Sequence, residues 1–144
     1  MSSGNDYLIS CDRALLNIPL IHEYLTTSYW SSGIPRAVVE RAIEHSLCFG
    51  VYCDSRQVGF ARVITDQATF AYLADVFILE PHRGQGLSKR LMTDISAHPS
   101  LQGLRRFVLA TRDAHGLYAQ FGFTPLADPS RLMERFCPDV YLAR

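Results

Sequence analysis

Apolar positions in the first half of the chain follow two different periods. Residues 6–11 alternate as expected for a strand, and residues 49–52 and 57–64 predict two antiparallel strands joined by a short turn. A spacing of three to four residues instead predicts one helix after Pro19 and a second from about Arg36. The first half is therefore expected to provide three strands and two helices.

The second half is predicted to alternate strands and helices. A strand that ends near Leu79 leads into an amphipathic helix, which stops at His98-Pro99. Later strands are expected at residues 105–111, 123–126 and 132–136, with a short helix after the first of them. This order predicts one α+β domain over residues 6–144, with a mixed, mostly antiparallel sheet of about six or seven strands and about four flanking helices.

Composition limits the classes of function. The chain is 48% hydrophobic and 19% charged, as in ordinary globular proteins, and its formal net charge of +0 gives no reason to expect nucleic acid or an anionic membrane as a partner. No apolar run approaches the roughly 20 residues of a transmembrane helix, and the first residues lack the pattern of a signal peptide. We therefore expect a cytoplasmic protein. The cysteines and histidines show no metal-binding spacing, so no metal is expected.

The segment from residue 76 to 88 carries the clearest chemical signal. An apolar run with strand character is followed by a turn with Gly84 and Gly86, which opens a helix. Glycines let the backbone approach a ligand closely, and the first amides of a helix are unpaired at its positive dipole end. The pattern indicates a phosphate cradle; the alternative is a tight turn with no ligand. It is not a dinucleotide fingerprint, because Lys89 stands where a third glycine is needed, and it lacks the Lys-Ser/Thr of a P-loop.

Residues 83–88, Arg-Gly-Gln-Gly-Leu-Ser, resemble the acyl-CoA-binding motif of the GNAT N-acetyltransferase superfamily, Arg/Gln-x-x-Gly-x-Gly/Ala, with Ser88 as the one departure. Residues 114–123 resemble the second signature of the family, a short helix that carries Leu-Tyr and closes on Gly-Phe. Thr111 stands where relatives commonly have Asn, so one side-chain contact of the family is not matched. The two signatures follow each other in the family's order, and the predicted elements match the GNAT fold.

The resemblance implies acetyl-CoA as the cosubstrate. In the family, the strand before the glycine turn diverges from the next parallel strand, and its backbone holds the pantetheine arm as an added strand would be held. The amides that follow take the pyrophosphate. The implied cofactor-binding residues are Phe77, Ile78, Arg83, Gly84, Gln85, Gly86, Leu87, Ser88 and Thr111.

Two residues are candidates for proton transfer. The resemblance implies that Tyr118 donates a proton to the departing thiolate, since a phenol with a pKa of about 10 is protonated at neutral pH. Asp75, a carboxylate within an apolar strand, is the candidate general base; the alternative is a structural aspartate bound to a neighbouring loop. Tyr29 and Trp30 follow the first predicted helix, where the family contacts its acceptor. They either wall a small acceptor pocket or cap the core beneath the loop.

We therefore expect an acetyl-CoA-dependent N-acetyltransferase that acetylates a primary amine of a small or amino-acid-like acceptor by direct attack on the thioester. Two alternatives stay open: a protein acetyltransferase acting on lysine or an N-terminal amine, and a catalytically silent acyl-CoA-binding sensor. The resemblance also leaves room for a homodimer. The identity of the acceptor amine does not follow from the sequence.

Overall fold

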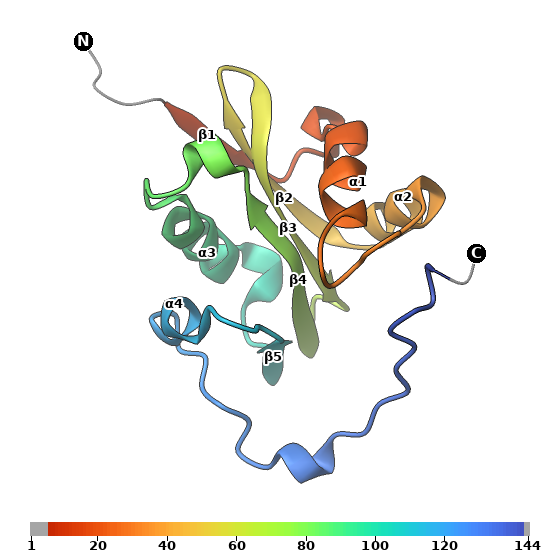
Figure 1. Cartoon of the computed structure of the whole chain (residues 1–144). Helices are drawn as coiled ribbons and strands as arrows, with labels where there is room; N and C mark the ends of the chain where they lie inside the picture. The colour runs from red at the N-terminus through yellow and green to blue at the C-terminus, as the bar shows by residue number, and fades with distance from the viewer. Residues whose placement is uncertain (1–5, 143–144) are drawn as a thin grey trace.

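A five-stranded sheet runs through the middle of the computed structural model, which describes residues 6–142 (Figure 1). Its strands, in spatial as well as chain order, are β1 (Tyr7–Ser10), β2 (Leu47–Cys53), β3 (Arg56–Thr65), β4 (Phe70–Ile78) and β5 (Arg106–Leu109). Neighbouring strands are antiparallel except for β4 and β5, which are parallel. The expected mixed, mostly antiparallel sheet is therefore confirmed.

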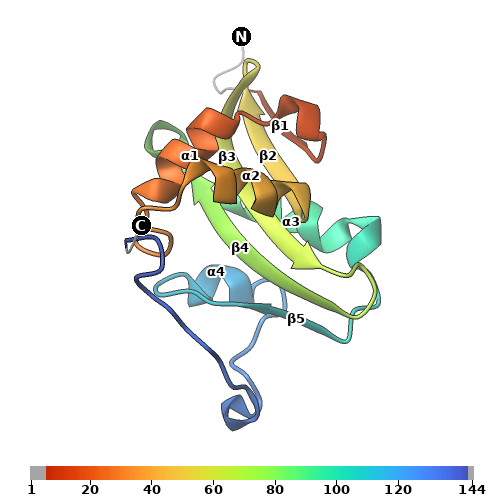
Figure 2. The same cartoon turned by 90° about the vertical axis from the view of Figure 1, so that its right-hand side faces the viewer.

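Helices cover both faces of the sheet, with α1 and α2 on one face and α3 and α4 on the other (Figure 1, Figure 2). Their bounds are α1 (Ile18–Thr26), α2 (Arg36–Glu44), α3 (Leu87–Ala97) and α4 (His115–Ala119), and short 3-10 turns lie at η1 (Arg13–Leu15), η2 (Glu80–His82), η3 (Pro99–Leu101) and η4 (Pro129–Arg131). The start of α1 follows from local chemistry, because Asn17 Oδ1 accepts a hydrogen bond from the Leu20 amide (3.1 Å) and Pro19 suits the first turn. None of the described helices is long and apolar enough to cross a membrane.

Two apolar cores lie on opposite faces of the sheet. One packs α3 and α4 against residues such as Phe49 and Val51, and the other packs α1 and α2 against residues such as Cys48 and Phe60. Successive side chains of a strand point to opposite faces, so adjacent residues of β2 enter different cores. The sheet is therefore covered on both sides over most of its length.

The prediction of six or seven strands is wrong for the described residues. Residues 123–126 and 132–136 form no strand. After α4 the chain leaves the sheet and runs on as an exposed segment, so these residues have no neighbouring strand with which to pair (Figure 1). Residues 1–5 and 143–144, which include the expected end of the domain, lie outside the described residues.

β4 changes its pairing halfway along its length. Residues 70–73 pair with β5, whereas residues 74–78 continue beside β3 alone. The change falls at Asp75, whose φ of 58° is left-handed, and close to a shift of register against β3. The second half of β4 therefore has no strand partner on the side of β5.

Gly59 of β3 packs closely against this second half of β4. A Cβ atom at Gly59 would lie 2.7 Å from Ile78 Cδ1 and 3.1 Å from the Phe77 carbonyl oxygen. We predict that Gly59→Ala lowers the free energy of unfolding by about 1–3 kcal/mol, because the added methyl group displaces β4. Urea denaturation measures this change. Gly116→Ala in α4, where nothing lies within 4 Å, is the control and should cause no loss; equal losses would contradict the tight contact.

Candidate active site

The candidate site lies where β4 loses its pairing with β5. Three segments border this part of β4: the glycine turn between η2 and α3, the short helix α4, and the loop between α1 and α2. Arg83 ties the glycine turn to β4, and Trp30 ties the α1–α2 loop to β4. Tyr118 packs from α4 into the core that includes β4. Residues far apart in the sequence are therefore brought together at one end of one strand.

The glycine turn leaves its backbone open to a ligand. Gly84 and Gly86 have φ angles of 79° and 76°, in the left-handed region that favours glycine, and an added Cβ at either would meet nothing within 4 Å. Gly86 is the N-cap of α3, and no side chain caps that helix. Gln85 is exposed and Ser88 is half-buried. The unpaired amides and the dipole of α3 thus fit an anionic group of a cofactor.

Arg83 is engaged with the protein in this structure. Its Nε donates a hydrogen bond to the Ile78 carbonyl oxygen (2.8 Å), and its Nη2 donates one to the Tyr24 hydroxyl (3.2 Å). These bonds hold the glycine turn against the end of β4 and link it to α1. Because the side chain is still exposed, its predicted contact with a cofactor stays a prediction.

The side chains at the end of β4 point into the protein. The Phe77 ring is buried and stacks on Tyr24, with 3.9 Å between the ring centroids, and Ile78 is buried as well. Leu87, at the start of α3, belongs to the core on the other face. These three predicted cofactor contacts can therefore come only from backbone groups.

Asp75 is the centre of a network of hydrogen bonds. Its two carboxylate oxygens accept one bond from Arg62 Nε and one from Trp30 Nε1, both at 2.8 Å. The ion pair is largely removed from water, because the Arg62 and Asp75 side chains are 17% and 8% exposed. Arg62 also donates to Ser46 Oγ (3.1 Å), which donates to the Ala42 carbonyl oxygen of α2. Asp75 is thus bound to a neighbouring loop through Trp30, as the alternative of a structural aspartate predicted. A catalytic role for Asp75 stays a prediction.

Tyr29 and Trp30 stand at the surface and do not cap the core. They are 58% and 40% exposed, and their rings meet edge to face with 5.1 Å between centroids. The Arg112 guanidinium, from the segment between β5 and α4, lies 3.8 Å from the centre of the Tyr29 ring. On the other side, Trp30 lies 6.4 Å from the ring of Tyr24. This aromatic row joins the α1–α2 loop to the segment that precedes α4.

Tyr118 points into the protein from α4. It is 8% exposed and meets Phe123 edge to face, with 6.1 Å between the ring centroids. Burial raises the pKa of its phenol, and the nearby Tyr29 raises that pKa further. Its hydroxyl makes no hydrogen bond within residues 6–142. The phenol is therefore a protonated donor that is not engaged by the protein.

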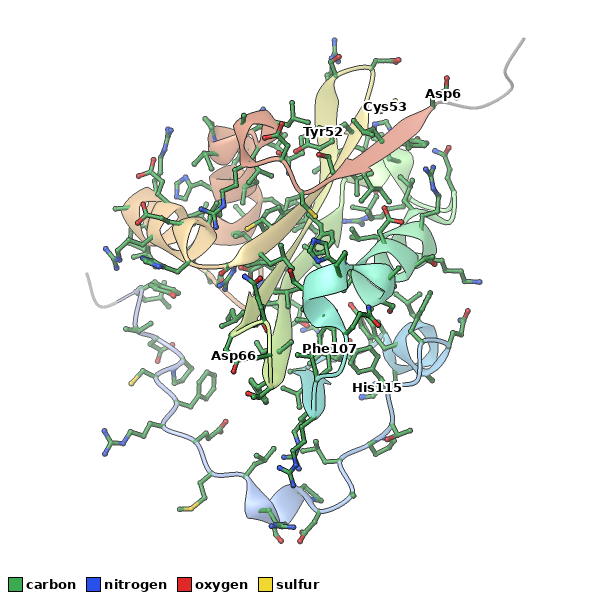
Figure 3. The ribbon with its side chains drawn as sticks, turned by 180° about the vertical axis from the view of Figure 1, so that it is seen from behind. Asp6, Tyr52, Cys53, Asp66, Phe107 and His115 are labelled. Atoms are coloured by element: carbon green, nitrogen blue, oxygen red, sulfur yellow. The ribbon has the colours of Figure 1, made fainter. Side chains whose placement is uncertain are left out.

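Thr111 has a local structural partner. Its hydroxyl oxygen accepts a hydrogen bond from the Ala114 amide (3.0 Å), which shapes the turn before α4. Its predicted contact with the cofactor stays a prediction. His115, which follows this turn, is exposed on α4 (Figure 3).

A small cavity of about 70 Å³ lies beside the Arg62–Asp75 pair. Apolar side chains of α1 and α2 line it together with Tyr141 from the C-terminal end of the described chain. A larger hollow of about 780 Å³ lies between the start of α1 and the β2–β3 turn, and it contains none of the predicted site residues. The small cavity joins the charged pair to the α1–α2 loop, because Ser31 and Ile34 of that loop line it as well.

Four residues of this site were not predicted from the sequence: Tyr24, Arg62, Arg112 and Tyr141. For Arg62 a signal exists, since it is a single charge within an apolar strand, as Asp75 is within the next one. Two opposite charges isolated in adjacent strands indicate a buried pair. The other three carry no comparable local signal, because Tyr24 fits an ordinary amphipathic helix and Arg112 and Tyr141 lie in irregular segments.

Comparison with known proteins shows which family this chain belongs to. The family model described as "Acetyltransferase (GNAT) domain" matches residues 43–125. A protein from Gibberella zeae that carries an acetyltransferase name is 33% identical, over 80% of this chain and 77% of its own length. A crystal structure of a protein ascribed to the GNAT family, from Xanthomonas campestris pv. campestris, is 60% identical, covers 94% of this chain and 96% of its own, and has a TM-score of 0.93.

The likeness extends to more distant structures. An aminoglycoside N-acetyltransferase solved in complex with CoA is 17% identical and has a TM-score of 0.61, covering 94% of this chain and 98% of its own. At this identity the likeness concerns the fold alone. The family model and the closer relatives decide the assignment: the chain belongs to the GNAT family of acetyltransferases and has the GNAT fold.

The Arg62–Asp75 pair generates a test of stability. We predict that Arg62→Met lowers the free energy of unfolding by about 3–5 kcal/mol, because it leaves a carboxylate buried without its cation. Denaturant unfolding measures the loss, and adding Asp75→Asn should recover part of it. The matched control is Arg36→Met, which breaks the exposed pair with Glu40 and should cost less than about 1 kcal/mol. Equal losses of unfolding free energy in the two arginine variants would show that the buried pair stabilises the fold no more than the exposed pair does.

Proposed function

We propose that this protein is an acetyl-CoA-dependent N-acetyltransferase that acetylates a primary amine of a small or amino-acid-like acceptor by direct attack on the thioester. The observation that carries the proposal is the juxtaposition at the end of β4. Residues 74–78 have no strand partner on the side of β5, an open glycine turn follows them, and Tyr118, whose phenol is unengaged, belongs to the same core cluster as Ile78 and Leu87. Family membership supports the same reaction class.

Different residues around β4 are proposed to bind different parts of acetyl-CoA. The backbone of Phe77 and Ile78 is proposed to hold the pantetheine arm in the place of a neighbouring strand. The amides from Gly84 to Ser88 are proposed to receive the pyrophosphate at the start of α3. Arg83 and Thr111 stand at the edges of this path as further contacts. Acetyl-CoA would supply the activated thioester.

The acceptor is proposed to enter from the side of the α1–α2 loop, where Tyr29 and Trp30 are exposed and the Trp30 indole donates a hydrogen bond to Asp75. An amine must lose its proton before it can attack. Each carboxylate oxygen of Asp75 accepts one bond in the structure and has a second lone pair, so Asp75 can still take this proton through water. The nitrogen then forms a bond to the acetyl carbon as the carbon–sulfur bond breaks. Tyr118 gives its proton to the departing thiolate. The nitrogen loses a second proton as it becomes the amide, and this proton returns to Tyr118 through solvent.

A panel of amines tests the proposal against its alternatives. An N-acetyltransferase should release CoA thiol from acetyl-CoA in an amine-dependent way, as measured with a thiol reagent. A silent sensor should bind CoA in calorimetry and release no thiol with any amine. A protein acetyltransferase should acetylate a peptide lysine or N-terminal amine and leave free amino acids and small amines unchanged.

The glycine turn generates a test of cofactor binding. We predict that Gly86→Asp weakens CoA binding by at least about 100-fold, equivalent to about 3 kcal/mol, because a carboxylate enters the proposed anion site. Isothermal titration calorimetry with CoA measures the change. Gly103→Asp is the matched control, since Gly103 also has a left-handed φ of 72° and open space around it. The cofactor lies elsewhere if both variants bind CoA equally well.

Tyr118 generates a test of chemistry. We predict that Tyr118→Phe lowers kcat and kcat/KM together by about 10²- to 10⁴-fold, with little change in CoA affinity, because only the proton donor is removed. Since burial raises the phenol pKa above its usual value of about 10, the Tyr118-dependent rate should hold through pH 9 and fall only above the raised pKa.

Steady-state kinetics and a CoA titration supply these measurements. Tyr52→Phe is the control, because the Tyr52 hydroxyl is also buried and has no hydrogen-bond partner but belongs to β2, away from the site. A Tyr118→Phe variant with a normal kcat would assign the proton to solvent instead.

A further inference from the structure

The aromatic row formed by Tyr24, Trp30 and Tyr29 has an arginine at each end. Arg83 Nη2 donates a hydrogen bond to the Tyr24 hydroxyl (3.2 Å), and the Arg112 guanidinium lies 3.8 Å from the centre of the Tyr29 ring. Within residues 6–142, neither arginine forms an ion pair with a carboxylate. The row that borders the proposed acceptor side therefore carries two cations that the described chain does not neutralise.

The carboxylates of this region do not balance the two arginines. Among the described residues that line the small cavity, Asp75 carries the one carboxylate, and its charge is already matched by Arg62. The acids next to the row in the sequence are Glu23, Glu80 and Asp113, and none of them forms an ion pair within the described part of the chain. The excess of positive charge favours an acceptor that brings a negative charge of its own.

The Arg112 guanidinium is held in place and is still free to bind. It lies over the face of the Tyr29 ring, and within residues 6–142 it makes no hydrogen bond. A guanidinium presents its N–H donors as a fixed fork, which matches the two oxygens of a carboxylate. Because Tyr29 already holds this side chain, less side-chain freedom is lost when an anion binds. The contact also puts the protein's own cation on a ring that could have received an acceptor ammonium.

Tyr29 places Arg112 close to the groups proposed to react. The Tyr29 ring meets Trp30 edge to face, and the Trp30 indole donates to Asp75, the proposed base. Burial raises the pKa of Tyr118, the proposed proton donor, and the Tyr29 phenol raises it further, so the two phenols are neighbours. An amine that reaches both the base and the proton donor therefore lies beside the ring over which Arg112 is held.

We propose that the acceptor is a primary amine that carries a free carboxylate, an amino acid in the broad sense, and that Arg112 determines this specificity by binding the carboxylate. The assignment rests on the proposed function and narrows its substrate class. Polyamines and aminoglycosides are poor acceptors in this scheme, because they bring further positive charge to Arg83 and Arg112. A lysine side chain or an N-terminal amine within a protein has no free carboxylate beside it.

Matched pairs of acceptors test this specificity. The pairs are the standard amino acids, β-alanine and γ-aminobutyrate, each beside its own carboxamide, and thiol release from acetyl-CoA is measured with every compound. For the best acceptor, kcat/KM should be at least about 10-fold higher for the carboxylate than for its carboxamide, because a charge-assisted bond is lost in the carboxamide. Basicity acts in the opposite direction, since the amine of an α-carboxamide loses its proton more readily. Equal values across all pairs would overturn the assignment and leave the N-acetyltransferase activity standing.

Variants of Arg112 test whether this residue makes the distinction. Arg112→Gln should raise the KM of the carboxylate until the two members of a pair have nearly equal kcat/KM, and Arg112→Lys should keep part of the preference, because it keeps the charge and loses the fork. The matched control is Arg106→Gln, an exposed arginine at the far end of β5, which should keep the full preference. If Arg112 only held Tyr29 in place, Arg112→Gln would lower both rates alike and leave their ratio unchanged, and the assignment would be wrong.

A binding measurement separates this assignment from the proposed function. Calorimetry with the CoA-bound protein detects acceptor binding without turnover. If no amine gave thiol release, the proposed function would be wrong, yet binding of an amino acid that is lost in its carboxamide and in Arg112→Gln would still support the carboxylate site. Absence of binding by every amino acid, or binding that does not change in Arg112→Gln, would overturn the site itself.

Discussion

The ion pair between Arg62 and Asp75 is the contact on which the site depends. A left-handed residue within a strand costs about 1–3 kcal/mol and persists only where its surroundings hold it. At Asp75 both carboxylate oxygens are bonded, one of them to a cation on the adjacent strand. The bend held in this way lies where β4 parts from β5. The backbone of residues 74–78, which has no strand partner on the side of β5, is therefore coupled to the ion pair between Asp75 and Arg62 of β3.

The same carboxylate also orders the α1–α2 loop, which we propose to border the acceptor. Trp30 is exposed over much of its surface, yet its indole donates to Asp75 from 45 residues away in the sequence. Through Tyr29 the loop reaches Arg112, which precedes the helix of Tyr118. A displacement of β4 would break the indole bond, and a displacement of the loop would leave a carboxylate oxygen unpaired. This network thus joins the β4 backbone that we propose to hold the cosubstrate, the α1–α2 loop that we propose to border the acceptor, and the segment that precedes the proposed proton donor Tyr118.

Local pattern predicted most of the elements but failed at the C-terminus. The strands around Val51, Phe60 and Phe77 and the helix after Gly86 form as expected, because each has a periodic apolar face and packs onto a core. Residues 132–136 have strand-forming composition, yet they form no strand in the single chain. A strand exists only beside another strand, and the position of that neighbour is a property of the fold or of the assembly.

The sequence by itself determined what depends on adjacent residues: the left-handed glycines of the turn, the helix that begins at their end, and the phenol on a short helix before Gly122. Tertiary structure decided what depends on distant ones. It gave Asp75 its two partners, turned Arg83 back onto Ile78, and brought Tyr141 to the small cavity. The reason is physical, since backbone preferences act over a few residues, whereas ion pairs and stacked rings form between groups that only the folded chain brings within a few ångströms.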